Sequence, residues 1–200
     1  MKMMKRLFCG LVFGALLAGN VLAADGEIMV CGFDSDSDLA VLNINHNDSV
    51  CTISTELAND SKGSLKVDIP SVTGEVYPGF MVSNNVKCAA PGWDTVKLNV
   101  CKNLPTNWKD YKYIKIDVYN ASAFPGSLNI KIMGKELETD IKKSFNKEAD
   151  LPKKKWKTLV YRMSDIAEKM SIDEIRQIEF FMLATPAPYT IYFDNLRMSK

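Results

Sequence analysis

Apolar and polar side chains alternate strictly at residues 113–119 and 128–132, within two expected strands, 113–119 and 128–133. Side chains two positions apart in an extended strand point to the same side, so each segment has one apolar and one polar side. A turn with Pro125 and Gly126 separates the two segments, which predicts an antiparallel sheet with one buried face and one face open to water. The apolar positions are Ile114, Ile116, Val118, Leu128, Ile130 and Ile132.

The rest of the chain contains further short strand-like segments, each bounded by Gly, Pro, Asn, Asp or Ser. About ten short strands joined by turns predict an all-β fold, either a sandwich or a barrel. Residues 164–170 predict one short helix, with Ser164 as its N-cap. The other expected strands are 39–42, 50–55, 64–69, 79–82, 95–100, 144–151, 157–162, 177–183 and 190–198.

The first 23 residues have the pattern of a secretory signal peptide. Three basic residues precede an apolar run at residues 7–18, and Val21 and Ala23 stand at the spacing that signal peptidase reads. The run is shorter than the roughly 20 apolar residues that span a bilayer. We therefore expect cleavage after Ala23 and export, either secreted or periplasmic, from a bacterial cell.

The expected mature chain, residues 24–200, is long enough for one domain with a full hydrophobic core and short for two. It contains no second apolar run, so we expect no membrane span. The full chain has a net charge of +1, and loss of the basic start lowers it further. Nucleic acids select strongly basic surfaces, so near neutrality argues against nucleic acid as the main partner.

Four cysteines remain after the expected cleavage, and an even number in an oxidising compartment predicts disulfides. Four cysteines allow three pairings, of which we favour the sequence-local one, Cys31 with Cys51 and Cys88 with Cys101. A zinc site is the weaker alternative, because there is no Cys-x-x-Cys pair and His46 is the only histidine.

The sequence lacks the motifs of common enzymes. It has no Gly-x-Ser-x-Gly elbow, no His-Glu-x-x-His and no Gly-rich phosphate loop. A glycosidase needs only two carboxylates at a set separation, and several acids lie on predicted strands. Because these acids alternate with Lys and Thr as on an ordinary solvated sheet, we interpret the chain as a binding module first and an enzyme second. The acids are Glu56, Asp68, Asp117 and Glu179.

Segments that follow one another along the chain also resemble a known family. They are CGFDSDSDLAVL, STELANDSKGSLKVDIP, WKDYKYIKIDVYN and the closing run WKTLVYRMSDIA, IRQIEFFM and YTIYFDNLRM. In this order they resemble the galactose-binding-like jelly rolls, the carbohydrate-binding modules found with secreted glycoside hydrolases. The resemblance covers nearly all of the mature chain. It implies a two-sheet antiparallel β-sandwich, a jelly roll, that binds a polysaccharide or oligosaccharide.

Members of this class commonly hold one structural calcium ion where the first and last strands meet. The resemblance places its carboxylate ligands at Asp34 and Asp194, with backbone carbonyls from residues 60–63. Calcium takes six to eight oxygen ligands and accepts carbonyls beside carboxylates. The alternative is that Asp34 is a turn residue and Asp194 a solvent-facing acid.

The class binds sugars on a sheet face or at the loops of one end, with aromatic rings on the sugar faces and amides or acids on the hydroxyls. The binding residues differ between members, so our candidates come from the chain itself. Tyr77 and Phe80 have a packing role as their alternative, and Trp108 and Trp156 are assigned to packing. The candidates are Trp93 in the loop 86–94, Tyr77 and Phe80 beside Pro78 and Gly79, and Asp117, Tyr119 and Asn129 on the polar side of the alternating strands.

The leading hypothesis is therefore a secreted, calcium-stabilised jelly roll that binds carbohydrate without catalysis, beside separate glycoside hydrolases. A small secreted polysaccharide hydrolase or lyase that uses paired carboxylates is one alternative. A surface adhesion or structural protein is the other, to which the lysine cluster at residues 153–157 points.

Overall fold

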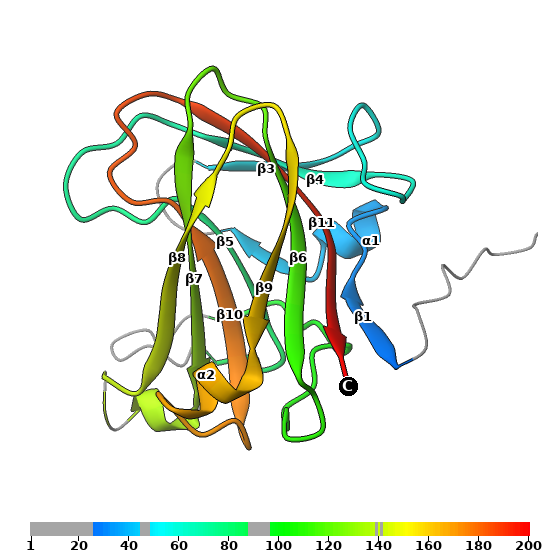
Figure 1. Cartoon of the computed structure of the whole chain (residues 1–200), viewed down its shortest axis with the longest axis vertical. Coiled ribbons are helices and arrows are strands. Elements are labelled where there is room, and N and C mark those ends of the chain that lie inside the picture. The colour runs from blue at the N-terminus through cyan, green and yellow to red at the C-terminus, as the bar shows by residue number, and fades with distance from the viewer. Residues whose placement is uncertain (1–25, 45–48, 88–96, 139, 141) are drawn as a thin grey trace, which may run out of the picture.

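The computed structural model describes residues 26–44, 49–87, 97–138, 140 and 142–200. The predicted signal peptide, Cys88 and Trp93 lie outside these residues. The described chain is a sandwich of two antiparallel sheets, with β7, β8 and β10 on the left of Figure 1 and β6, β9 and β11 on the right. The predicted all-β sandwich is confirmed.

Six strands form the first sheet. Their order is β3 (Val50–Ser54), β4 (Ser64–Ile69), β11 (Tyr189–Ser199), β6 (Tyr113–Asn120) and β9 (Trp156–Arg162), and β1 (Glu27–Cys31) also pairs with β11. We call this the terminal sheet, because it contains the first and last strands. Most of the expected strands in it are confirmed to within one residue at either end, whereas the sequence pattern did not predict β1.

Five strands form the second sheet, in the order β2 (Leu42–Ile44), β5 (Gly79–Ser83), β10 (Ile175–Phe181), β7 (Gly126–Gly134) and β8 (Ser144–Leu151). We call this the inner-chain sheet. Two short helices, α1 (Asp36–Leu39) and α2 (Met163–Ala167), and one 3-10 turn, Lys135–Glu138, complete the elements of the described residues.

The apolar sides of the two sheets face each other and form one core. Phe80 from the inner-chain sheet packs its ring 5.2 Å from that of Phe180 and 4.9 Å from that of Phe193, which belongs to the terminal sheet. Trp108 is fully buried, and its indole N–H donates to the carbonyl oxygen of Pro105 at 2.7 Å. Burying a large apolar side chain is worth about 1.5–3 kcal/mol, so such residues supply much of the stability. The packing role of Trp108 is confirmed.

The two alternating strands of the sequence are both present, but they do not form one sheet. β6 lies in the terminal sheet and β7 in the inner-chain sheet, so the turn with Pro125 carries the chain from one layer to the other. Their apolar sides meet in the core, and their polar sides lie on opposite surfaces of the sandwich. The expectation that both strands share one water-exposed face is therefore wrong.

Some local expectations also differ from the structure. Residues 36–39, expected to lead into a strand, form α1, because the carboxylate of Asp38 accepts the backbone N–H groups of Asp34 at 2.8 Å and Ser35 at 3.1 Å. Such a carboxylate satisfies N–H groups that a helix start leaves without partners. α2 begins at Met163, with Arg162 in place of Ser164 as its N-cap. No helix within the described ranges has the length and apolar character needed to cross a membrane.

Candidate functional site

The outer face of the inner-chain sheet carries polar side chains in rows across the strands. The register of the strands aligns two such rows. Because side chains of paired residues lie on the same face, each row forms a line of neighbouring groups. We call this surface the polar face. Its rows are Asn43, Met81, Glu179, Lys131 and Asn146, and then Phe181, Asn129 and Glu148.

The loop before β5 and the segment around Asn99 pack against this face. Met81 and Phe181 point outward, yet each is only 5% exposed. The ring of Tyr77, from the loop before β5, meets that of Phe181 edge-on at 5.4 Å. On the side of β2, Asn43 donates through Nδ2 to the carbonyl oxygen of Asn99 at 3.0 Å and accepts the backbone N–H of Asn99 at 2.7 Å. Met81 and Phe181 are therefore covered, and the exposed ring of Tyr77 presents an apolar surface at this edge of the polar face.

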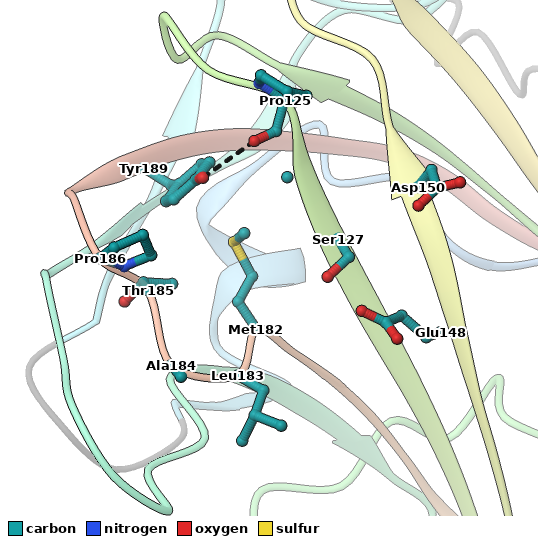
Figure 2. Close-up of a pocket in the computed structure, with 11 residues that line it drawn as sticks. Pro125, Ser127, Glu148, Asp150, Met182, Leu183, Ala184, Thr185, Pro186 and Tyr189 are labelled. Atoms are coloured by element: carbon teal, nitrogen blue, oxygen red, sulfur yellow. Dashed lines mark hydrogen bonds between the residues drawn. The ribbon is translucent and has the colours of Figure 1, made fainter.

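A pocket of about 370 Å³ opens where β7 begins and β8 ends (Figure 2). Ser127, Glu148 and Asp150 line it from these strands, and the loop 182–186 lines it from the opposite side. Leu183 is an exposed apolar side chain of this loop. Ser127 precedes Asn129 by two residues and Glu148 pairs with Asn129, so the pocket continues the polar face.

Gly126 lets the wall of this pocket close tightly. A Cβ atom at Gly126 would lie 2.9 Å from the ring of Tyr189 and 3.0 Å from the Cε atom of Met182. The hydroxyl of Tyr189 donates to the carbonyl oxygen of Pro125 at 3.0 Å, as Figure 2 shows. The loop itself is fixed, because Thr185 donates through Oγ1 to the carbonyl oxygen of Pro70 at 2.7 Å. The pocket is thus held by hydrogen bonds and close packing before any ligand arrives.

The structure divides the predicted sugar-binding residues among several places. Tyr77, which is 43% exposed, and Asn129 both lie at the polar face. Phe80 is fully buried in the core and is not available to a ligand at the surface. Asp117 and Tyr119 lie on the outer face of the terminal sheet, on the opposite side of the molecule. Trp93 lies outside the described residues.

The outer face of the terminal sheet has an aromatic row of its own. Lys66, Tyr192, Tyr119 and Trp156 are aligned by register across four strands. The ring centroids of Tyr119 and Trp156 are 5.5 Å apart, and those of Tyr119 and Tyr192 are 6.3 Å apart. Trp156 is half-buried at the outer surface instead of in the core. The sequence analysis missed this. Trp156 lies three positions before the buried Leu159, so the alternation of the strand places the two side chains on opposite sides.

Asp117 belongs to a buried ion network, not to a wet face. Its carboxylate is 2% exposed and accepts a hydrogen bond from Arg197 Nη1 at 2.9 Å and one from Thr158 Oγ1 at 2.6 Å. Glu27 joins the network, with Lys115 at 2.6 Å and Arg197 at 3.5 Å. These contacts tie β1, β6 and β11 together, so the prediction of Asp117 as an exposed ligand group is wrong.

Asp34 and Asp194 both bind the turn between β3 and β4, through its N–H and hydroxyl groups. Asp34 Oδ1 accepts the backbone N–H groups of Lys62 at 2.8 Å and Gly63 at 3.0 Å. Asp194 Oδ2 accepts the N–H of Asn59 at 2.7 Å and the hydroxyl of Ser61 at 2.5 Å. Asp194 is fully buried, so the alternative of a solvent-facing acid is wrong for it.

The charge at this turn lacks a protein counterion. Burial raises the pKa of Asp194 to about 6, the nearby charge of Asp34 adds to the rise, and the hydrogen bonds from Ser61, Asn59 and Asn195 oppose it. Within the described part of the chain, no Lys or Arg forms an ion pair with either carboxylate. No cluster of three or more His, Cys, Asp or Glu occurs among the same residues. Two carboxylates fit calcium in kind, and the remaining ligands would be carbonyls or water.

The favoured disulfide between Cys31 and Cys51 is absent, because the register keeps these residues apart. Cys31 pairs with Leu196 of β11, whereas Cys51 pairs with Val67, which pairs with Ile191. Five residues along β11 correspond to about 16 Å at 3.3 Å per residue, far beyond the Cα separation of about 4.4–6.8 Å that a disulfide allows. Cys31, Cys51 and Cys101 are free and buried. Cys88, the expected partner of Cys101, lies outside the described residues.

No protein-family model matches the chain, and no curated protein matches it in sequence. Solved structures do match it in fold. The family 11 carbohydrate-binding module from Clostridium thermocellum, solved with a β-1,3-1,4-mixed-linked tetrasaccharide, superposes with a TM-score of 0.60 at 16% identity. That match covers 88% of this chain and 97% of the module.

Two larger proteins contain a similar part. An exo-β-agarase matches with a TM-score of 0.62 at 12% identity, over 86% of this chain and 24% of its own. The structure of the CBM22-1 and GH10 modules of a Clostridium thermocellum xylanase, with xylohexaose, matches with a TM-score of 0.52 at 11% identity, over 88% of this chain and 29% of its own. This chain therefore spans about a quarter of the agarase. At these identities the likeness shows the fold, which is the sandwich of carbohydrate-binding modules.

Proposed function

We propose that this chain binds a polysaccharide or oligosaccharide, without catalysis, on the polar face and in the adjoining pocket. The observation that carries the proposal is the combination on one surface of the exposed ring of Tyr77, amide and acid groups, and a preformed pocket. Sugar sites need flat apolar contact beside donors and acceptors, and ligand pockets have volumes of about 300–1,000 Å³. The pocket of about 370 Å³ suits a short stretch of a sugar chain.

The groups on this face have complementary chemical roles. The exposed ring of Tyr77 offers an apolar surface to the C–H groups of a pyranose. Asn129 both donates and accepts hydrogen bonds, and the exposed carboxylates of Glu148 and Asp150 accept them from sugar hydroxyls. The fold is shared with modules solved with mixed-linked tetrasaccharide and with xylohexaose, so β-glucan and xylan are rational first ligands, with agarose as a third.

Affinity electrophoresis through gels that contain each polysaccharide tests the proposal. We expect at least one of them to retard the protein, and Tyr77→Ala and Asn129→Ala to reduce the retardation at least tenfold in apparent affinity. Tyr119→Ala is the matched control, because it removes a partly exposed aromatic ring from the opposite face. Equal retardation of all three variants, or a loss confined to Tyr119→Ala, would place binding elsewhere.

The same polysaccharides separate binding from chemistry. After long incubation with the protein, we expect no new reducing ends and no unsaturated products. Products whose formation stops in a Glu148→Gln or Asp150→Asn variant would instead establish a hydrolase or lyase.

We also propose that one calcium ion stabilises the turn between β3 and β4. Support comes from the two adjacent carboxylates, Asp34 and Asp194, whose charges have no protein cation beside them in the described chain. A bound ion would supply the positive charge and hold β1, β11 and this turn together. Thermal unfolding with calcium and with chelator should differ by several degrees, since a ligand that binds only the folded state stabilises it. Equal midpoints, with no calcium in the purified protein by elemental analysis, would contradict the proposal.

Finally, we propose that the chain is exported, to the periplasm or outside the cell, and acts beside separate glycoside hydrolases. The pattern of residues 1–23 supports export. N-terminal sequencing of the protein from its native cells should begin at Ala24. A chain that retains Met1 in the cytoplasm would contradict export.

A further inference from the structure

Two of the free cysteines lie next to each other in the fold, although 70 positions separate them in the sequence. Cys31 is the last residue of β1, and the thiol of Cys101 donates to the carbonyl oxygen of Val30, the residue before it, at 3.4 Å. The two thiols are close enough that a charge on Cys101 raises the pKa of Cys31. Both side chains are buried. The structure therefore brings together a pair that sequence proximity did not suggest.

The position of Cys101 is fixed by its backbone as well. Its N–H donates to the carbonyl oxygen of Ser83, the last residue of β5, at 2.7 Å. Cys31, in turn, is held in register with Leu196. Each cysteine is therefore anchored to a different sheet, and a bond between them would join the two layers.

We propose that Cys31 and Cys101 form a disulfide when this chain folds in an oxidising compartment. The bond would join β1 of the terminal sheet to the segment that follows Asn99, which borders the polar face. Cys51 is excluded as the partner of Cys31 by the strand register described above. The pairing does not depend on carbohydrate binding, so either can fail without the other.

The chemistry is thiol–disulfide exchange with a disulfide donor, such as oxidised glutathione or the disulfide of an exported oxidoreductase. One cysteine thiolate attacks the donor disulfide and releases one thiol, and the second thiolate then attacks this mixed disulfide and releases the other. The protein gains one sulfur–sulfur bond, and the two cysteine protons end on the two released thiols. Burial raises the pKa of both Cys31 and Cys101, which makes their thiolates scarce in the folded chain. The exchange therefore takes place during folding, before the strands close over the sulfurs.

Peptide mapping can identify the pair, because cleavage before aspartate separates all four cysteines. The fragments 25–33, 48–59, 68–93 and 94–109 each contain one of them. Protein refolded with reduced and oxidised glutathione, alkylated under denaturing conditions and digested, should give a linked species of fragments 25–33 and 94–109. Reduction before alkylation should remove it. A link between 25–33 and any other fragment, or four alkylated thiols, would overturn the proposal.

Variants supply an independent readout. A reductant should lower the thermal midpoint of the wild-type protein by several degrees. Cys31→Ser and Cys101→Ser should lose this dependence on reductant. Cys51→Ser is the matched control, because Cys51 is also buried but lies outside the proposed pair, and it should keep the dependence. If either serine variant fails to fold, Cys→Ala at the same position serves in its place. A dependence that is unchanged in the Cys31 and Cys101 variants, or that Cys51→Ser removes, would contradict the assigned pair.

Discussion

Replacing Arg197 by methionine should destabilise the protein strongly, because it leaves a buried carboxylate without its cation. Asp117 is 2% exposed and receives Arg197 Nη1 at 2.9 Å. Methionine fills similar space without charge, so Asp117 would keep only the hydrogen bonds from Thr158 and Asn195. Breaking a buried pair from one side costs about 3–5 kcal/mol.

Unfolding in guanidinium chloride measures this cost. With a slope of about 4 kcal/mol per molar, the midpoint should fall by about 1 M. Lys109→Met is the matched control, since Lys109 pairs with Asp173 at 2.9 Å but both side chains are more than half exposed. An exposed pair is worth about 0–1 kcal/mol, so the control midpoint should move by less than about 0.25 M.

The double variant Arg197→Met with Asp117→Asn separates the ion pair from other effects. Removing both charges should restore part of the stability, with a coupling energy of more than about 1 kcal/mol. A loss below about 1 kcal/mol in the single variant, or strictly additive losses in the double variant, would refute the description of this network as buried and coupled.

Three more outcomes follow from the packing and the titrating groups. The pKa of Asp194 is raised from 3.8 to about 6, so the folded state binds more protons than the unfolded state in this range. In chelator, the contribution of Asp194 should be fully present below about pH 4, and about 3 kcal/mol of stability should be lost as the pH rises through 6. In denaturant titrations at several pH values, Asp194→Asn should abolish this part of the pH dependence. Phe80→Ala should cost about 3–5 kcal/mol of unfolding free energy while leaving polysaccharide retardation unchanged under conditions where the variant is folded, because Phe80 is a core residue; weakened retardation at full stability would contradict this. Gly79→Ala should lower the free energy of unfolding by about 1–3 kcal/mol or more, because its Cβ would collide with the carbonyl oxygen of Phe180; a wild-type midpoint in guanidinium chloride would show that β5 and β10 do not approach so closely.

The alternation of side chains predicted the strands well but not the layer to which each belongs. A period of two shows which side of β6 and of β7 is buried, and both buried sides are confirmed. It does not show whether consecutive strands pair or cross to the other sheet. That choice depends on pairings such as Ile178 with Ile132, which joins positions 46 residues apart. For this reason the sequence analysis wrongly placed Asp117, Tyr119 and Asn129 on one face.

The functional residues were predictable to different degrees, because a local pattern does not show which distant segments meet. The family resemblance paired Asp34 with Asp194, and the structure brings both to one turn. The sequence analysis placed Asp117 on a water-exposed face, but Arg197 and Thr158 reach it from the neighbouring strands β11 and β9, which are distant in sequence. The pocket of Figure 2 needs the loop 182–186 to stand beside β7 and β8, which no local pattern indicates.

The central claim is that the polar face of the inner-chain sheet binds carbohydrate. Titration of ¹⁵N-labelled protein with a mixed-linked β-glucan tetrasaccharide, then with xylohexaose and an agarose oligosaccharide, tests it most directly by mapping shifted amide signals. We predict that, for at least one of these sugars, the shifts cluster on the outer residues of β5, β7, β8 and β10, on Tyr77 and on the loop 182–186. Shifts confined to the aromatic row of Tyr119 and Trp156, or no shifts with any of the three sugars at millimolar concentration, would contradict it.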